Sequence, residues 1–167
     1  MQSIAADIFQ AVIINYDTIC NGLNKPIMMQ GLFLALCHKG FITGTANYEH
    51  LHCQQGELFI IIPNTVFVLH SVSEDFVAKV LYVPPRHIPD IAVSAQDIDL
   101  ERILKFNILT LDSQLQEDLQ YLHTVILHQL EKPMTVYRRK LMLAMINSYI
   151  FIILGNVRGG SSEQSLS

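Results

Sequence analysis

The stretch that decides the fold begins Leu32-Phe-Leu-Ala-Leu-Cys37-His-Lys-Gly40 and ends Phe76-Val-Ala-Lys-Val-Leu-Tyr82. Between these ends, short apolar runs rich in Val, Ile, Phe and Tyr alternate with Gly, Pro, Asn and Gln. Such runs are typical of short antiparallel strands joined by tight turns. Several of them within about fifty residues predict a small β-sandwich or β-barrel, which holds one small ligand or a packed interior.

Length and composition indicate one domain with a sizeable core. The chain has 167 residues, of which 50% are hydrophobic and 16% are charged, which is typical of a folded domain and not of a disordered one. Its net charge of −4 argues against direct binding of nucleic acid, because proteins that bind phosphate backbones usually carry a basic face.

The cysteines and the first residues both favour a cytoplasmic protein. Cys20, Cys37 and Cys53 are an odd number without a CxxC pair, which indicates free thiols in a reducing compartment. The start of the chain lacks a basic region and includes Asp7, so no signal peptide is expected. The apolar run 141–157 is shorter than the roughly 20 residues of a membrane span, so we expect a buried or interfacial helix and no membrane partner.

The apolar period becomes helical after Pro84-Pro85, which ends the strands. One helix is expected within residues 94–104, and a second begins at Asp112 or Ser113, either of which is a good N-cap. The apolar stripe of this second helix consists of Leu115, Leu119, Leu122, Val125, Ile126 and Leu130. Pro133 separates it from a last helix at about residues 135–154, so the two make an antiparallel hairpin and the fold class is α+β.

The last helix is apolar on more faces than one packing partner requires. Nearly every position from 141 to 154 is apolar, and a helix that is apolar all round must be buried all round. In a chain of this size, that pattern predicts burial against a second copy, and hence a homodimer. The predicted interface residues are Leu141, Met145, Tyr149, Ile150 and Ile153.

The interior of the predicted barrel is a candidate site for a small molecule, because barrel mouths commonly hold ligands. The candidates for its lining are mostly aromatic with few polar anchors: Phe33, Phe41, Thr43, Phe59, Phe67 and Tyr82. These side chains either fill the core or bind a ligand. In the second case, the lining favours an uncharged or aromatic molecule over a phosphorylated sugar.

The sequence also predicts how the strands connect. Residues 27–37 are expected to form one strand, and residues 66–70 and 76–82 to form a last hairpin. His50 and His52 alternate with apolar neighbours, so these histidines are expected on the outer face of their strand.

The order of short motifs resembles a known family. A strand ends in Cys37-His-Lys-Gly40, a hairpin follows, Gln55-Gly56-Glu57 opens an aliphatic strand, and Ser73-Glu-Asp-Phe76 opens the next. This order is similar to the cupin-like N-terminal domain of AraC-type transcriptional regulators, especially those of Bacteroides and relatives. We therefore expect a cupin-like, jelly-roll barrel in residues 1–84, a helical segment with the dimerisation hairpin in 85–157 and a linker tail in 158–167.

In that family, a DNA-binding domain with two helix-turn-helix units follows the linker, and this chain ends where it would begin. The resemblance implies a ligand-sensing and dimerisation domain, with a small-molecule effector, whose contact with DNA is made by a domain absent from this chain. The alternative is a stand-alone cupin-like binding protein or enzyme. Because the sequence contains no nucleophile elbow, phosphate-binding loop or zinc-ligand cysteine pair, neither catalysis nor a cofactor is expected.

Cupin enzymes hold a metal on two histidines and a glutamate, and His50, His52 and Glu57 superficially fit the first cupin motif. We reject that alignment because residues 56–63 look like the second motif, which moves the first one to an upstream segment without His or Glu. Phe67 stands where the histidine of the second motif would fall. Since a metal needs three or four convergent ligands, no metal site is expected.

Overall fold

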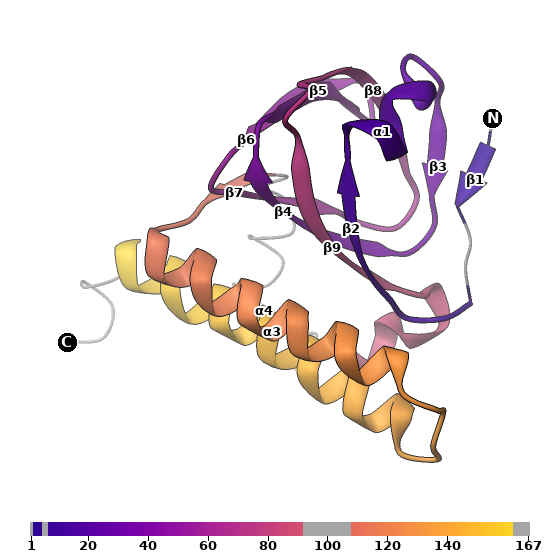
Figure 1. Cartoon of the computed structure of the whole chain (residues 1–167), viewed down its shortest axis with the longest axis vertical. Coiled ribbons are helices and arrows are strands. Elements are labelled where there is room, and N and C mark those ends of the chain that lie inside the picture. The colour runs from indigo at the N-terminus through magenta and orange to yellow at the C-terminus, as the bar shows by residue number, and fades with distance from the viewer. Residues whose placement is uncertain (1, 5–6, 92–107, 162–167) are drawn as a thin grey trace.

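The computed structural model describes residues 2–4, 7–91 and 108–161, so the helix expected within residues 94–104 lies outside the described part of the chain. Two sheets face each other, and a helical hairpin lies against the outer side of one of them (Figure 1). The predicted fold class, α+β with strands followed by a helical hairpin, is confirmed.

Each sheet has five strands within the described part of the chain. The first sheet has the order β1-β3-β8-β5-β6 and the second sheet the order β10-β7-β4-β9-β2. Their bounds are β1 (Gln2–Ile4), β2 (Gln10–Asn15), β3 (Ile27–Met29), β4 (Leu32–Lys39), β5 (Phe41–Ala46), β6 (Glu49–Gln54), β7 (Glu57–Ile61), β8 (Thr65–Val72), β9 (Val77–Val83) and β10 (Ile108–Thr110). Among the described residues, all pairings except that of β1 with β3 are antiparallel, and none joins the two sheets, so the barrel is open.

The chain crosses between the sheets at two places where the sequence predicted continuity. Residues 27–37 are not one strand, because β3 lies in the first sheet and β4 in the second. At the crossing, a Cβ on Gly31 would clash with the ring of Tyr82, so only glycine fits there without rearrangement. The predicted hairpin of residues 66–70 and 76–82 is also wrong, because β8 and β9 belong to different sheets.

The second sheet is buried on both faces. On β4, Leu34 and Leu36 belong to a buried cluster that they share with the two long helices. The alternate residues Ala35 and Cys37 belong to a second cluster between the two sheets. A strand that packs on both faces needs an unbroken apolar sequence, which explains why residues 32–37 show no alternation.

The helices follow from local capping signals. They are α1 (Tyr16–Ile19), the 3-10 turns η1 (Cys20–Gly22) and η2 (Pro85–Asp90), α3 (Ser113–Glu131) and α4 (Arg138–Ser161). The predicted N-cap of α3 is confirmed, since the Asp112 carboxylate accepts a hydrogen bond of 2.7 Å from the backbone N–H of Leu115. The backbone of α4 continues to Ser161, into the stretch expected as a linker tail. No helix in the described ranges is long and apolar enough to cross a bilayer.

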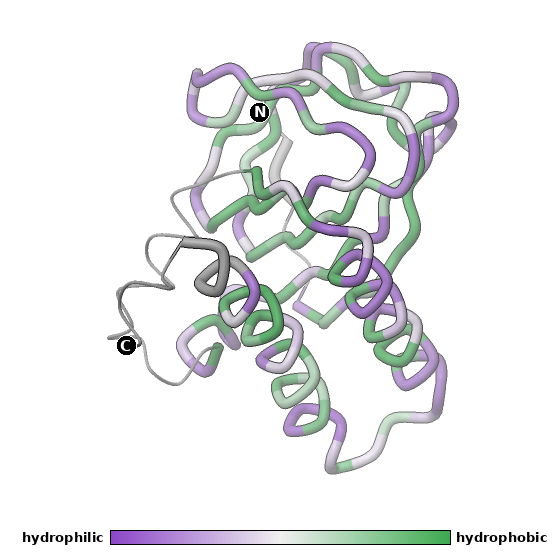
Figure 2. The backbone as a smooth tube through the Cα atoms, turned by 90° about the vertical axis from the view of Figure 1, so that its left-hand side faces the viewer, coloured by the Kyte–Doolittle hydropathy of each residue, from purple (hydrophilic) through white to green (hydrophobic). Residues whose placement is uncertain are grey.

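The apolar surface of α4 is largely used within the chain itself. Of the five residues predicted at a dimer interface, Tyr149, Ile150 and Ile153 are at most 5% exposed and belong to the cluster between the second sheet and the helices. Their assignment to a surface for a second copy is therefore wrong. Leu141 is 40% exposed and Met145 is half-buried, so these two remain at the surface. Figure 2 shows hydrophobic positions along both helices beneath the strands.

Candidate functional site

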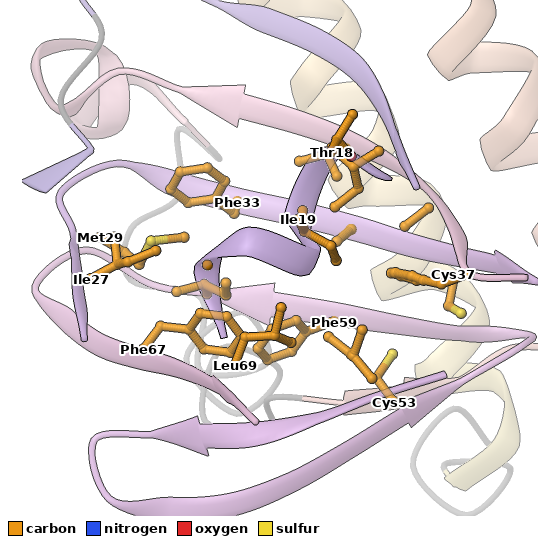
Figure 3. Close-up of a pocket in the computed structure, with 18 of the residues that line it drawn as sticks. Thr18, Ile19, Ile27, Met29, Phe33, Cys37, Cys53, Phe59, Phe67 and Leu69 are labelled. Atoms are coloured by element: carbon orange, nitrogen blue, oxygen red, sulfur yellow. The ribbon is translucent and has the colours of Figure 1, made fainter. Parts of the chain in front are cut away.

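A cavity of about 360 Å³ lies between the two sheets. Its walls come from strands of both sheets and from α1 and η1 (Figure 3). The lining side chains are apolar except for the hydroxyl of Thr18 and the thiols of Cys37 and Cys53. The volume is within the range of sites for small organic ligands, which begins at about 300 Å³.

Aromatic rings from both sheets meet at the cavity. Phe59 on β7 and Phe67 on β8 line it, and their ring centroids lie 5.6 Å apart across the gap between the sheets. Phe33 on β4 also lines it, and its ring packs on Tyr82 with a centroid distance of 4.8 Å. These rings give the cavity flat, polarisable walls that suit an aromatic or otherwise apolar ligand.

The segment between β2 and β3 covers one side of the cavity. In α1, the Asn15 side chain accepts from the N–H of Thr18 at 3.1 Å, and the Thr18 hydroxyl accepts from the N–H of Asn15 at 2.8 Å. This capping box holds Thr18 and Ile19 over the cavity. Val12 and Thr18 line the cavity and are also exposed to solvent, which places its mouth between β2 and α1.

Two thiols stand at the far end of the cavity from Ile27 and Met29 (Figure 3). Cys37 comes from β4 in the second sheet and Cys53 from β6 in the first. A hydrogen bond from the Cys53 side chain is the main reason that the pKa of the Cys37 thiol is lowered. The same interaction, together with burial, raises the pKa of the Cys53 thiol.

Three of the six predicted lining residues, Phe33, Phe59 and Phe67, line this cavity. Tyr82 is buried beside Phe33 but is not part of the lining. The placement of Phe41 and Thr43 in the interior is wrong. These two do share one face of β5, as their spacing predicts, but it is the outer face.

The reason for this error is a break in the alternation before β5. The pairing of β4 with β9 shifts register between Cys37 and Lys39, and Gly40 has a positive φ of 72°. The irregularity resets which residues point inward, so that Ile42 lines the cavity, whereas Phe41 stacks on the exposed ring of His52. The predicted outer position of His50 and His52 is confirmed.

Sequence reasoning missed the contribution of residues 12–29 to the site. Val12, Thr18, Ile19 and Met29 all line the cavity, although none of them was among the predicted lining residues. The spacing of Asn15 and Thr18, which form the capping box, is the signal that predicts a short helix here.

A second groove, of about 470 Å³, lies between β2, η2 and the turn that joins α3 to α4. In it, His87 lies between Arg86 and Arg139, and burial together with these two cations lowers the pKa of its ring. The arginines form ion pairs with Asp7 and Asp90, respectively. Since these charges already compensate one another, the groove is a weaker candidate for a ligand site than the cavity between the sheets.

No three His, Cys, Asp or Glu side chains lie close enough together to hold a metal ion, as far as residues 2–4, 7–91 and 108–161 are concerned. The sequence was also compared with models of known protein families. The model of the family described as AraC-like ligand binding domain matches residues 30–142. The chain belongs to this family.

Two solved structures superpose on most of this chain. This AraC-like domain superposes on the transcriptional activator CuxR with 14% identity and a TM-score of 0.49, and on an apo variant of ToxT from Vibrio cholerae with 8% identity and a TM-score of 0.52. The matches cover 88% and 93% of this chain, but only 48% and 58% of those two chains. The likeness to ToxT supports the cupin-like fold. A search of curated protein sequences gave no match.

Proposed function

We propose that this chain is the ligand-sensing and dimerisation part of a DNA-binding transcriptional regulator of the cytoplasm, and that its effector binds between the two sheets. The observation that carries the proposal is the cavity of about 360 Å³ in a domain of the AraC-like ligand-binding family. In this proposal, a further domain that is not part of this chain makes the contact with DNA. The role of the chain is to bind and to signal, and not to catalyse.

The lining supports an uncharged, apolar or aromatic effector. Among the described residues, the walls offer the rings of Phe33, Phe59 and Phe67 and only one hydroxyl and two thiols as polar groups. Moving an ionised group from water into such surroundings without a partner costs many kcal/mol, whereas burial of apolar surface contributes about 25 cal/mol per Å². Sugar phosphates and other anions are therefore poor candidates.

The second sheet provides a physical link from the cavity to the helices. In β4, Phe33 and Ala35 face the cavity, and their neighbours Leu34 and Leu36 pack in the cluster with α3 and α4. A ligand that prefers one arrangement of this sheet also changes the population of helix arrangements, by its difference in affinity for the two. We propose that this shift alters how two copies of the chain are held together.

Dimerisation is assigned to the side of α4 that the chain's own core leaves open. Leu141 and Phe151 are 40% and 49% exposed, and Ala144 and Ser148 lie exposed between them at helical spacing. Small residues between two large apolar ones allow a second helix to approach closely. This revised surface keeps Leu141 from the interface predicted from the sequence and adds Phe151.

A thermal-shift screen tests the proposal. Purified protein is heated with uncharged aromatic and aliphatic compounds and, in parallel, with sugar phosphates of similar size at equal concentration. Binding of the folded state at a hundred times the Kd stabilises by about 2.7 kcal/mol, which raises the Tm by several degrees. We expect stabilisation by members of the uncharged set. If only the anionic sugars stabilised the domain, the assignment of the effector class would be wrong.

A further inference from the structure

The two thiols of the cavity are set apart from the rest of its lining by their chemistry. Cys37 and Cys53 are each 2% exposed and both line the cavity, so the wall of the cavity is where another molecule would meet them. They come from opposite sheets and lie at the same end of the cavity (Figure 3). Each side chain is also the strongest influence on the pKa of the other.

The backbone holds the two cysteine-bearing segments together. The N–H of Gly56, just beyond β6, donates to the carbonyl of Cys37 at 3.0 Å, and the N–H of Gln55 donates to the carbonyl of Gly40 at the same distance. These bonds tie the turn after Cys53 to the turn after Cys37. A disulfide requires Cβ atoms about 4 Å apart, and hydrogen bonds between the two turns keep the cysteine-bearing segments close to each other.

The two thiols are also unequal. The interaction that lowers the pKa of Cys37 and raises that of Cys53 makes Cys37 the better thiolate and leaves Cys53 protonated. The thiolate is the nucleophile in reactions of cysteine, and a second thiol beside it converts an oxidised sulfur into a disulfide. The pair therefore contains an attacking and a resolving cysteine.

We propose that Cys37 and Cys53 form a peroxide-reactive dithiol, and that the cavity presents it to apolar organic hydroperoxides. The Cys37 thiolate attacks the outer oxygen of the hydroperoxide. The O–O bond breaks, a sulfenic acid forms on Cys37, and the alcohol leaves after taking up a proton. The Cys53 sulfur then attacks the Cys37 sulfur, the S–S bond forms, and the sulfenic oxygen leaves as water with the Cys53 proton. The hydroperoxide is the oxidant, and it accepts the two electrons that the dithiol loses.

The apolar lining determines which peroxide reacts fastest. An organic hydroperoxide buries its hydrocarbon part against rings such as Phe59 and Phe67, a gain in affinity that hydrogen peroxide lacks. The disulfide would link the two sheets at one end of the cavity and so change the effector site. Disulfides that form transiently in a reducing compartment are commonly redox-sensing. This inference rests on the proposed function, because it uses the same cavity.

The test uses reduced protein treated with one equivalent of cumene hydroperoxide or of hydrogen peroxide. Intact mass is expected to show the loss of two hydrogens, and peptide mapping a link between Cys37 and Cys53. We expect cumene hydroperoxide to react about tenfold faster or more. In Cys53→Ala the reaction is expected to be slower, because the side chain that lowers the pKa of Cys37 is gone, and to stop at a sulfenic acid on Cys37 that dimedone traps. Cys20→Ala, which changes a cysteine outside the cavity, is the matched control and should form the disulfide normally.

Unchanged thiols, a disulfide that includes Cys20, or equal rates with the two peroxides would each overturn the inference. The mapping of the wild-type link does not depend on whether a variant folds. To separate this outcome from failure of the proposed function, the thermal-shift screen is repeated on reduced Cys37→Ala. If uncharged compounds stabilised that variant but the wild type formed no disulfide, the dithiol inference would be wrong and the proposed effector site would stand. Absence of stabilisation in both proteins would count against the effector site itself.

Discussion

His123 is the one buried histidine of α3, and it couples the stability of the fold to pH. It is 2% exposed, and its Nε2–H donates to the carbonyl of Val80 on β9 at 3.2 Å. Burial lowers the pKa of its ring below the ordinary 6.5. Between the folded and the ordinary pKa, the unfolded chain binds more protons than the folded chain, so acid favours unfolding.

We predict that the free energy of unfolding is fully present above pH 6.5 and decreases as the pH falls through that value toward the lower pKa of the folded state. In His123→Gln, most of this decrease should disappear, with a remainder from His87, whose pKa is lowered too. Urea unfolding at a series of pH values measures the effect. An equally steep pH dependence in wild type and variant would show that His123 does not cause it.

At the scale of single residues, the sequence predicts which side chains share a face but not which face is inside. Phe41 and Thr43 lie together, as their spacing requires, yet they point outward. The register shift after Cys37 decides this, and it depends on pairing with β9, which is distant in sequence. His123 was overlooked for a related reason, since a polar residue within an apolar stripe is not counted as part of the core.

At the scale of elements, α3 is held to the second sheet by a narrow buried stripe. Leu119 is fully buried, whereas Val125 on the same helix is 47% exposed. We expect Leu119→Ala to lower the free energy of unfolding by about 2–5 kcal/mol, because it removes buried methyl groups and leaves a cavity. Val125→Ala, the matched control, should change it by no more than about 0.5 kcal/mol. Similar losses in both variants, measured by urea unfolding, would contradict this packing.

The open side of α4 carries a separate prediction. The double variant Leu141→Asp and Phe151→Asp places two carboxylates on this surface, and we expect the protein to become monomeric while it remains folded. Analytical ultracentrifugation with circular dichroism measures both properties.

Tyr121→Asp, which changes an exposed aromatic residue of α3, serves as the control and should leave the dimer intact. A double variant of α4 that still sediments as a dimer would exclude this surface. Substitution of Ile150 is unsuitable for this purpose, because its burial means that an acidic residue there would unfold the chain.

The helical hairpin illustrates what sequence pattern can and cannot establish. Its existence, its proline-containing connection and the Asp112 cap follow from local signals, and the structure contains them. The sequence does not show which surface the apolar residues of α4 pack against, because burial against the chain's own sheet and burial against a second copy require the same composition. Tyr149, Ile150 and Ile153 therefore looked available to a partner, although the chain itself buries them.

At the scale of the whole molecule, the second sheet packs against a different partner on each face. Its inner face lines the cavity and its outer face packs on the helices, so a single layer of strands separates the cavity from the helical hairpin. The sequence could predict the presence of an apolar interior but not its unfilled volume, because that depends on how closely two twisted sheets approach. The contribution of α1 to the cavity was missed for a different reason, because the capping-box spacing of Asn15 and Thr18 was not used as a helix signal.

The most direct test of the account fills the cavity and measures binding. Ala35 lines the cavity from β4, and Ala35→Phe would occupy much of the space, whereas Thr45→Phe adds the same ring to the outer face of β5. The best-stabilising uncharged compound from the thermal-shift screen is titrated into each protein by isothermal calorimetry. We predict one site per chain in wild type and in Thr45→Phe. In Ala35→Phe we predict that the affinity is weaker by a factor of about ten or more. Unchanged affinity in Ala35→Phe would show that the effector binds elsewhere.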